Sequence, residues 1–349
     1  MMNYRFIIYL LLLVLCAGNT FAQDLFNYSN DYKIMFYNVE NLFDTENDSL
    51  TNDEEFLPDG ERFWNKHKYY TKLNHIYKVI IALGKWEPPA IIGICEIENR
   101  KVLSDLVNNT PLVKYEYKIL HRDSPDRRGI DVAMLYREDY FEPLHTEFIT
   151  IHMPEDPEFK TRDILYTKGI AKGADTLHVF INHWPSRWGG QLESEDKRIF
   201  VAQKLRLKVD SLLALNPNSN IILTGDFNDY PANKSISVVL GAISNLDSIE
   251  NTNLYNLSSV FGQFENVGSH KYQGEWGVLD QVIVSGALLK QSNRIYTSTN
   301  DIFIFNENFL LEPDDAYTGM RPKRNFTGFK YNEGFSDHLP TYIQLYFTE

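Results

Sequence analysis

The side chains most capable of chemistry in this sequence stand at the boundaries of short apolar runs. They are carboxylates, carboxamides and imidazoles: Asn38, Glu96, Asp131, Asn182, His183, Asp226, Asn228, Asp280, Asp337 and His338. One Asp or Asn at the end of an apolar run has a simple explanation, because both residues readily start turns. Their recurrence from one run to the next instead indicates a shared cleft, in which the ends of several strands meet along one rim.

These residue types favour a particular chemistry. Oxygen donors without a cluster of cysteines suit a hard cation such as Mg²⁺ or Mn²⁺ better than a zinc–thiolate site. Histidines beside carboxylates suit proton transfer or the stabilisation of developing negative charge. A metal ion, orienting amides and His–carboxylate pairs together are typical of an enzyme that directs water onto a phosphate ester.

Apolar and β-branched segments must position these groups. Short runs of this kind recur at 34–37, 91–95, 132–136, 177–181, 221–224, 278–284 and 341–347. Many are apolar at successive positions, which is typical of strands covered on both faces. Helical periodicity extends over 66–83 and 193–215, and a shorter helix is expected near 233–240. We therefore expect an α/β fold in which two packed sheets have helices outside.

Ordered segments around these residues resemble the motifs of one superfamily. They read FYNVEN at 36–41, ICEIEN at 94–99, RGIDVA at 128–133, INHW at 181–184, TGDFND at 224–229, LDQV at 279–282 and SDHLP at 336–340. From about residue 33 to the C-terminus the chain resembles the endonuclease/exonuclease/phosphatase superfamily, as a secreted member of bacterial type. The resemblance implies the deoxyribonuclease I-like fold, a four-layer α/β sandwich of two packed, mainly antiparallel mixed sheets flanked by helices.

The resemblance also implies roles for individual residues. Glu96, with Asn38 and Asp337, would hold the catalytic Mg²⁺ or Mn²⁺. Asp226 would orient or deprotonate the attacking water, and Asn228 would position a phosphate oxygen.

Two imidazole–carboxylate pairs are implied as well. His338 with Asp280, and His183 with Asp131, would contact the scissile phosphate and stabilise the transition state. A carboxylate beside each imidazole would fix its tautomer and favour its cationic form. The identity of the general base stays open, as does the choice between one metal ion and two.

Substrate contacts are expected from Asn38, Asn182 and Arg187. Arg187 lies in the segment PSRWGG at 185–190, and a guanidinium can bind two phosphate oxygens at once. The segment 313–335 mixes basic and aromatic residues, which suits either the phosphates and rings of a substrate or an exposed loop anchored by its aromatics.

Two departures from the family pattern bear on the substrate. Apurinic-site endonucleases of the family have a tyrosine in the segment that reads RRGID at 127–131 here, so DNA-repair activity is in doubt. Gln281 follows Asp280 where the family more often has Tyr or Arg, which would alter substrate contacts.

The segment 44–61 carries eight acidic residues and no Lys or Arg. A solvated acidic loop is the simpler interpretation, and a structural Ca²⁺ site is the alternative. If this loop flanks the cleft, it would repel a long polyanion.

Residues 1–22 have the parts of a secretory signal peptide. Arg5 precedes an apolar run over 6–17, and the sequence TFA at 20–22 suits a cleavage site. The run is shorter than the roughly 20 residues that a spanning helix needs, so no stable membrane span is expected. We expect export to the periplasm or the extracellular space, with residues 23–349 forming one domain.

Cysteine usage agrees with such processing. Acylation at Cys16 would instead make a lipoprotein, but Leu15 stands where a small residue is usual. Cleavage after Ala22 leaves only Cys95, which lies in an apolar run, so an internal disulfide is excluded.

The net charge of −13 over 349 residues argues against a protein that coats nucleic acid or anionic lipid through a basic surface. We expect an exported, divalent-metal-dependent phosphoester hydrolase, with phosphodiesterase or nuclease action on DNA or RNA as the first choice. The alternative is a phosphatase or phosphodiesterase for a small ester such as an inositol phosphate, a nucleotide or a phospholipid headgroup. A binding module is disfavoured because every motif position keeps its working side chain, and the sequence gives no evidence for an oligomer.

Overall fold

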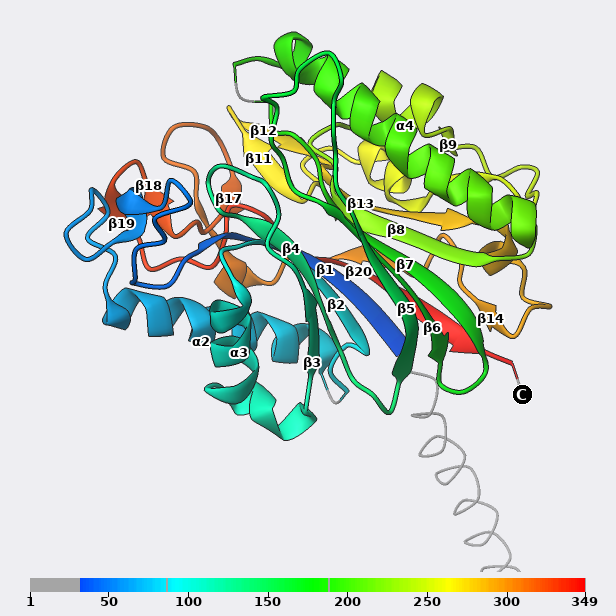
Figure 1. The fold of residues 1–349 in the computed structure, drawn as a ribbon, viewed down its shortest axis with the longest axis horizontal. Helices are drawn as coiled ribbons and strands as arrows, with labels where there is room; N and C mark the ends of the chain where they lie inside the picture. The colour runs from blue at the N-terminus through cyan, green and yellow to red at the C-terminus, as the bar shows by residue number, and fades with distance from the viewer. Residues whose placement is uncertain (1–31, 86, 188, 349) are drawn as a thin grey trace, which may run out of the picture.

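The computed structural model describes residues 32–85, 87–187 and 189–348 (Figure 1). The expected signal peptide at 1–22 lies outside these residues. Within the described ranges, no helix combines the length and the apolar character needed to cross a membrane.

The first large sheet has the strand order β14-β20-β1-β2-β4-β3, with β15 also paired to β20. Its strands are β1 (Tyr32–Leu42), β2 (Ile91–Ile97), β3 (Lys118–His121), β4 (Asp131–Tyr136), β14 (Ile295–Tyr296), β15 (Ile302–Ile304) and β20 (Thr341–Phe347). β1 and β2 are parallel, whereas β20 and β4 join them in antiparallel fashion. A parallel pair needs a crossover connection, and α2 (Lys66–Gly84) supplies it between β1 and β2.

The second large sheet has the order β5-β6-β7-β8-β13-β10-β9. Its strands are β5 (Phe141–Ile149), β6 (Ile164–Ala171), β7 (Asp175–His183), β8 (Asn220–Asp226), β9 (Ala242–Ile243), β10 (Leu254–Asn256) and β13 (Asp280–Ser285). β7 and β8 are parallel and are connected through α4 (Gln191–Leu215), while β13 runs antiparallel to β8. Each large sheet is therefore built around one parallel β-α-β unit.

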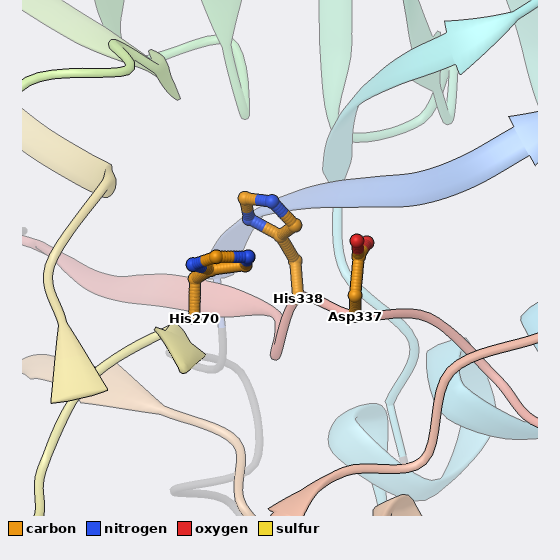
Figure 2. Close-up of side chains that lie close together, drawn as sticks. All are labelled: His270, Asp337 and His338. Atoms are coloured by element: carbon orange, nitrogen blue, oxygen red, sulfur yellow. The ribbon is translucent and has the colours of Figure 1, made fainter. Parts of the chain in front are cut away.

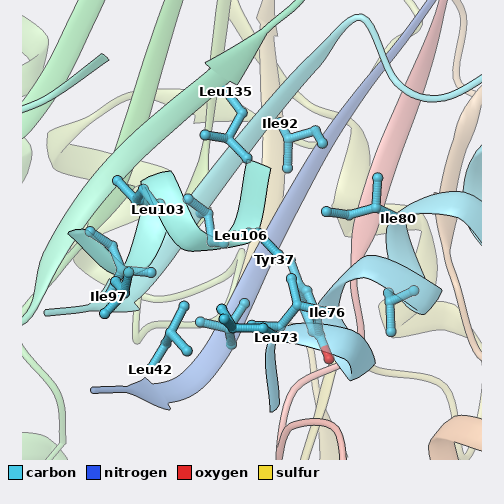
Figure 3. Close-up of a cluster of buried hydrophobic side chains, with 14 of the residues drawn as sticks. Tyr37, Leu42, Leu73, Ile76, Ile80, Ile92, Ile97, Leu103, Leu106 and Leu135 are labelled. Atoms are coloured by element: carbon cyan, nitrogen blue, oxygen red, sulfur yellow. The ribbon is translucent and has the colours of Figure 1, made fainter. Parts of the chain in front are cut away.

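The two sheets pack face to face and carry helices on their outer faces (Figure 1). One core cluster lies between the sheets, with Phe36, Met134, Ile181 and Val282 among its buried members. A second cluster joins the first sheet to α2 and α3 (Arg100–Asn108), where Ile76 and Leu106 point toward the strands (Figure 3). A third lies between the second sheet and α4. The expected four-layer α/β sandwich is confirmed.

Local signals in the sequence explain the start and the buried face of α2. The Asn65 side chain accepts a hydrogen bond from the backbone N–H of Lys68 at 3.1 Å, which caps the start of α2. Tyr69, Leu73 and Ile76 follow at helical spacing and are buried. The expected helix over 66–83 is confirmed with one more residue, and that over 193–215 with two more residues at its start.

All seven apolar runs became strands, but some elements carried no clear signal. The shorter helix expected near 233–240 is a π-helical turn at Ser235–Val239. α3, the short β3 and the hairpin of β5 and β6 were not predicted. β5 is largely exposed or half-buried at the edge of its sheet, so its sequence lacks the buried-strand pattern.

The remaining elements are short. Three two-stranded hairpins and six short helices complete the described chain: β11 (His270–Tyr272) with β12 (Glu275–Gly277), β16 (Leu311–Pro313) with β17 (Met320–Pro322), β18 (Phe326–Thr327) with β19 (Lys330–Tyr331), and the helices η2 (Glu54–Phe56), η3 (Pro111–Tyr115), η4 (Ser235–Val239), η5 (Leu257–Gln263), η6 (Gly286–Leu289) and η7 (Asn308–Leu310). The hairpin of β18 and β19 lies at the end of the molecule toward which β1 runs (Figure 1).

Candidate active site

The carboxyl ends of the two parallel strand pairs meet at one place. β1 and β2 bring Asn38 and Glu96 there from the first sheet, and β7 and β8 end at His183 and Asp226 in the second. Asn38 Nδ2 lies 3.1 Å from Asp226 Oδ2, so this hydrogen bond crosses from one sheet to the other. The carboxyl ends of parallel strands are the usual place for ligands in α/β sheets. The predicted cleft therefore has a defined centre.

Backbone irregularities aim the side chains of the first sheet. The pairing register shifts both between β1 and β2 and between β2 and β4 where these strands reach the site. Glu40, Asn41 and Glu96 have positive φ angles of 53°, 59° and 60°. Non-glycine residues adopt this conformation only where the surrounding structure imposes it, and such bulges commonly re-aim a side chain at an active site. Glu96 Oε2 consequently accepts a hydrogen bond from the Asn41 N–H at 3.0 Å.

Asn38 links the carboxylates of the site. Its Oδ1 accepts a hydrogen bond from the backbone N–H of Glu40 at 3.0 Å, and its Nδ2 donates to Glu96 Oε1 at 3.2 Å as well as to Asp226. The amide nitrogen, which cannot ligate a cation, thus faces the two carboxylates. In this arrangement Asn38 orients Glu96 and Asp226, while its expected role as a metal ligand stays a prediction.

Asp226 is the centre of the polar cluster. Its Oδ2 lies 3.8 Å from His183 Nε2 and 3.9 Å from His338 Nε2, and its Oδ1 accepts the backbone N–H of Asn228 at 2.9 Å. Burial, with additional repulsion from Asp280 and Glu96, raises the pKa of Asp226 to about 6. The distances to the two imidazoles are too long for direct hydrogen bonds. The three groups instead converge on a small space between them.

His338 is held as a cation. Its Nδ1 lies 2.7 Å from Asp280 Oδ2, the pair that the sequence predicted. Burial works against the charged form, but the neighbouring carboxylates Asp280, Asp226 and Asp337 raise the pKa of His338 well above its usual value. Nδ1 therefore donates to Asp280, and Nε2 carries a proton toward the centre of the site.

His183 is held in the opposite state. Burial and the nearby positive charges of Arg162 and Arg128 lower the pKa of His183 well below its usual value. Its Nε2 lies 3.9 Å from Glu96 Oε1, and within the described part of the chain its Nδ1 has no hydrogen-bond partner. His183 is therefore a neutral imidazole at the wall of the site.

The predicted pair of His183 with Asp131 is wrong. Asp131 Oδ2 lies 2.9 Å from His121 Nε2, and Asp131 Oδ1 accepts the backbone N–H of Ser124 at 2.8 Å. His121 ends β3, which lies antiparallel to β4 and brings this ring beside Asp131. The four residues of β3 carry no distinctive pattern, so the sequence gave no reason to place His121 there.

Asp337 lies beside His338, which precedes β20, and His270, which begins β11. Asp337, His338 and His270 each offer a ligand atom within 4.8 Å of the others (Figure 2). A second such group consists of Asp226, Asp280 and His338. Carboxylate oxygens suit Mg²⁺ or Mn²⁺. Neither group includes Glu96, whose side chain is 16% exposed and whose Oε1 lies 3.9 Å from His183 Nε2 on the other side of Asp226.

His270 was not predicted. It is the first residue of β11, which forms a hairpin with β12, and its ring centroid lies 4.6 Å from that of His338. Burial and the charge of His338 lower the pKa of His270 to about 4, so the ring is neutral. No motif marked it, because its position depends on an isolated bridge between His270 and His338.

A further charged group, of which only the segment 313–335 that holds Arg324 was singled out from the sequence, lies beside Asp337. Arg324 Nη2 contacts Asp337 Oδ2 at 3.0 Å and Glu40 Oε1 at 3.1 Å. Lys72 of α2 is fully buried and donates from Nζ to the backbone oxygen of Phe335 at 2.7 Å. Burial and the charge of Asp337 raise the pKa of Glu40 to about 7, and burial lowers that of Lys72 to about 8. The sequence does carry a signal for Lys72. It stands three residues after Tyr69 and four before Ile76, so it shares the apolar face of α2 with them.

Asn182 and Arg187 do not face the site as expected. Asn182 is fully buried, donates from Nδ2 to the Thr224 backbone oxygen at 3.2 Å and accepts from Trp184 Nε1 at 3.2 Å. Arg187 Nε donates to the Asn228 backbone oxygen at 2.8 Å, and its guanidinium lies 4.1 Å from the ring centroid of Tyr230.

Asn228 itself is tied back to the β7 side. Its Nδ2 donates to the Trp184 backbone oxygen at 3.0 Å, and its backbone has a φ of 51°. Arg187 and Asn182 therefore support the loops that carry Asn228 and His183.

The two segments singled out by composition differ in their relation to the site. From 313–335, Arg324 reaches Asp337, while Phe326 is buried. In 44–61, six of the eight acids are exposed or half-buried, as expected of a solvated loop, whereas Asp44 and Asp53 are buried. Among the described residues, the groups of acids and histidines close enough to hold a cation include none from 44–61.

A family model and several solved structures match this chain. The model of the Endonuclease/Exonuclease/phosphatase family matches residues 33–346. No curated protein matches the sequence. The fold is similar to that of an endonuclease/exonuclease/phosphatase family protein from Bacteroides thetaiotaomicron, with TM-score 0.53 and 15% identity over 91% of this chain and 98% of the other.

Two further solved structures share the fold. The human nocturnin catalytic domain with bound sulfate has TM-score 0.52 and 15% identity over 91% of this chain and 95% of the other. D. rerio TDP2 complexed with a single-strand DNA product has TM-score 0.53 and 14% identity over 90% and 98%. The chain belongs to the endonuclease/exonuclease/phosphatase family and is a phosphoester hydrolase.

Proposed function

We propose that the protein is a divalent-metal-dependent phosphodiesterase that cleaves nucleic acid by directing water onto a backbone phosphate. One observation carries this proposal: Asp226 Oδ2 lies within 3.9 Å of both a protonated His338 and a neutral His183, and Asn38 joins it to the carboxylate of Glu96. A base, a fixed positive charge and a cation-binding carboxylate are the parts that hydrolysis of a phosphate ester needs. No cysteine or serine nucleophile is required.

Each side chain has a separable task in this reaction. A bound Mg²⁺ or Mn²⁺, held by Glu96 and Asp337, would neutralise phosphate charge and polarise the ester. Asp226, with its pKa raised to about 6, accepts a proton from water as pH rises above that value. His338 donates from Nε2 to a phosphate oxygen on which negative charge develops. His183, as a neutral ring, orients a phosphate oxygen or the attacking water.

Nucleic acid is favoured as the substrate by a structural relative. D. rerio TDP2 has been solved with a single-strand DNA product on the same fold. The alternative, a small phosphate ester, is favoured by the depth of the site. The side chains of Asp226, His183 and His338 are at most 8% exposed, so a terminal phosphate on a small molecule reaches them without distortion of a strand.

A substrate panel tests the proposal. Protein that starts at Gln23 is incubated with plasmid DNA, RNA, bis(p-nitrophenyl) phosphate, inositol phosphates and sphingomyelin, with Mg²⁺, Mn²⁺, Ca²⁺ or EDTA. Cleavage of the polymers with Mg²⁺ or Mn²⁺ but not with EDTA is the expected result. Hydrolysis of the small esters alone establishes the alternative, and inactivity on every substrate with every metal contradicts both.

We also propose that residues 1–22 direct export and are removed after Ala22, leaving one domain from residue 23. The charged start, the apolar run and the small residues before the cleavage site support this proposal. Mass spectrometry of protein expressed with its full N-terminus tests it. A mature start at Gln23 is expected in the periplasm or the medium, whereas an acylated Cys16 establishes a lipoprotein.

A further inference from the structure

A basic hollow lies beside the active site. It has a volume of about 740 Å³ and is lined mainly by the loop before β4, the segment between β5 and β6 and the first turns of α4, with Asn52, Pro185 and Ser186 at its edges. We call it the basic groove and define it by Arg127, Arg128, Lys160, Arg162 and Lys197. The loop between β5 and β6 passes near the start of α4 (Figure 1), and Lys197 Nζ lies 4.9 Å from the ring centroid of Phe159.

The groove has a charge opposite to that of the whole chain. Among the residues that the structure describes, two acids line it, Asp126 and Glu193, against five Lys or Arg. Asp126 is already engaged, because its Oδ2 lies 2.9 Å from Arg162 Nη1. Arg127 pairs with Glu158 at 3.1 Å, but both side chains are well exposed, so this ion pair contributes little and opens readily. The groove therefore offers surplus positive charge in a molecule of net charge −13.

The basic groove adjoins the part of the active site formed by His183. Arg162 Nε donates to the His183 backbone oxygen at 3.2 Å, and its Nη2 contacts the backbone oxygen of Trp184. Pro185 and Ser186 line the groove two and three residues after His183. Because an extended chain covers at most about 3.6 Å per residue, these groups lie within roughly 11 Å of His183. A ligand in the groove is thus a neighbour of the reacting phosphate.

The groove also contains an unsatisfied polar atom. Thr161 lines it and is only 2% exposed, yet its Oγ1 has no hydrogen-bond partner among the described residues. Buried hydroxyl groups in folded proteins are normally paired. The hydroxyl is itself buried, so a ligand in the groove would first meet the more accessible ammonium groups of Lys160 and Lys197.

We propose that the basic groove binds a second phosphate of the substrate, the one adjacent to the scissile phosphate on a nucleic-acid strand. This inference rests on the proposed phosphodiesterase function. Arg162 fixes the inner wall of the groove, and the ammonium groups of Lys160 and Lys197 contact the phosphate. A strand is thereby positioned by its backbone charge and not by its base sequence.

Dinucleotides separate this subsite from the chemistry. TpT has only the scissile phosphate, whereas pTpT carries a second one, and bis(p-nitrophenyl) phosphate lacks any neighbour. The wild-type kcat/KM is expected to be at least tenfold higher for pTpT than for TpT. In Lys160→Gln/Lys197→Gln this preference is expected to fall below threefold, with hydrolysis of bis(p-nitrophenyl) phosphate unchanged within twofold.

A matched control comes from the same helix. Lys204 also lies on α4, with Nζ 5.0 Å from the ring centroid of Phe200, so Lys204→Gln removes the same charge and the same kind of ring contact outside the groove. Lys160→Gln/Lys204→Gln is expected to lose less of the pTpT preference than Lys160→Gln/Lys197→Gln. Equal loss in both double variants, or equal loss on pTpT and bis(p-nitrophenyl) phosphate, overturns the proposal.

Binding gives a readout that does not depend on turnover. In a Glu96→Gln background, anisotropy of a fluorescent single-stranded oligonucleotide is expected to show at least tenfold weaker binding when Lys160 and Lys197 are replaced. The slope of log K against log salt should fall by about 1 for each phosphate-contacting lysine removed. Unchanged affinity and slope overturn the groove. Absence of all hydrolysis by the wild type, with normal binding losses, overturns only the phosphodiesterase function.

Discussion

The two histidines of the active site lie in electrically opposite regions of one molecule. His338 stands among Asp280, Asp226 and Asp337, which raise its pKa, whereas burial and the charges of Arg162 and Arg128 lower the pKa of His183. The acidic side suits a bound cation and a protonated imidazole. The basic side continues into the groove and suits a polyanion. The two imidazoles thus differ in charge state because their surroundings differ.

This contrast also explains how a chain of net charge −13 can accept a phosphate substrate. The acids near the site are engaged with Asn38, His338 or Arg324, and the surplus Lys and Arg line one groove. Net charge describes the whole surface, whereas recognition depends on the local field.

Removing the carboxylate of Glu96 should have the largest effect on activity. Glu96→Gln keeps the shape of the side chain but removes the charge that a divalent cation needs, so kcat is expected to fall by about 10³-fold. Steady-state assays over a range of Mg²⁺ concentrations measure this loss. Glu142→Gln, on the exposed part of β5, serves as the control and should retain full activity. A Glu96→Gln enzyme with wild-type activity would show that the site is wrongly assigned.

Replacing Asp280, the partner of His338, should make His338 neutral at a lower pH and so more like His183. In Asp280→Asn the ring loses the carboxylate that holds its Nδ1 proton, so the pKa of His338 falls. Activity that needs the imidazolium is lost as pH rises through that pKa, and the alkaline limb of the pH–rate profile should therefore move to lower pH. We expect kcat at pH 8 to fall by about 10²-fold or more. An unchanged alkaline limb would exclude His338 as the required cation.

The acidic region also depends on a buried cation. Lys72→Met removes the ammonium group next to Glu40 and leaves the Phe335 backbone oxygen without its donor. Loss of one member of a buried charged network is expected to lower the free energy of unfolding by about 3–5 kcal/mol. Urea denaturation measures this change, and Lys204→Met on the partly exposed face of α4 should change it by less than about 0.5 kcal/mol. Equal effects of the two substitutions would mean that Lys72 is not coupled to Glu40.

The smallest effect concerns a histidine of β7 far from the chemistry. Burial lowers the pKa of His178 to about 4, and its Nδ1 lies 2.9 Å from the Tyr166 hydroxyl. The unfolded chain binds a proton at pH 6.5 where the folded chain does not, so this contribution to stability is lost as pH falls from 6.5 toward 4. His178→Asn is expected to reduce the pH slope of the unfolding free energy there by up to about 1.4 kcal/mol per pH unit. An identical slope in the variant would contradict a neutral His178.

The sequence predicted the fold and the centre of the site, because each motif residue adjoins a strand that is apolar on both faces. Asn38, Glu96, His183 and Asp226 meet because parallel strands bring their carboxyl ends together. The partners of Asp131 and Arg187 could not be predicted in this way. They depend on which short strand or loop packs alongside, as β3 does when it brings His121 to Asp131.

Other residues were missed because they carry no motif at all. Arg162 and Lys160 lie in the irregular connection between β5 and β6, and neither of these strands was predicted. The helical spacing places Lys72 on the apolar face of α2. Its burial could have been predicted only by assuming that a lysine on such a face is buried. Side-chain partners between distant segments remain the part of a site that periodicity does not encode.

The antiparallel pairing of β1 with β20 has a practical consequence. Tyr32 pairs with Leu345, whereas Phe36 pairs with Thr341 close to the SDHLP segment, so the start of β1 and the end of β20 lie together, away from the catalytic rim. Attachment of the protein to a bead or a sensor surface through either of these strand ends would leave the cleft turned outward. An immobilised enzyme should then digest long substrates as freely as short ones.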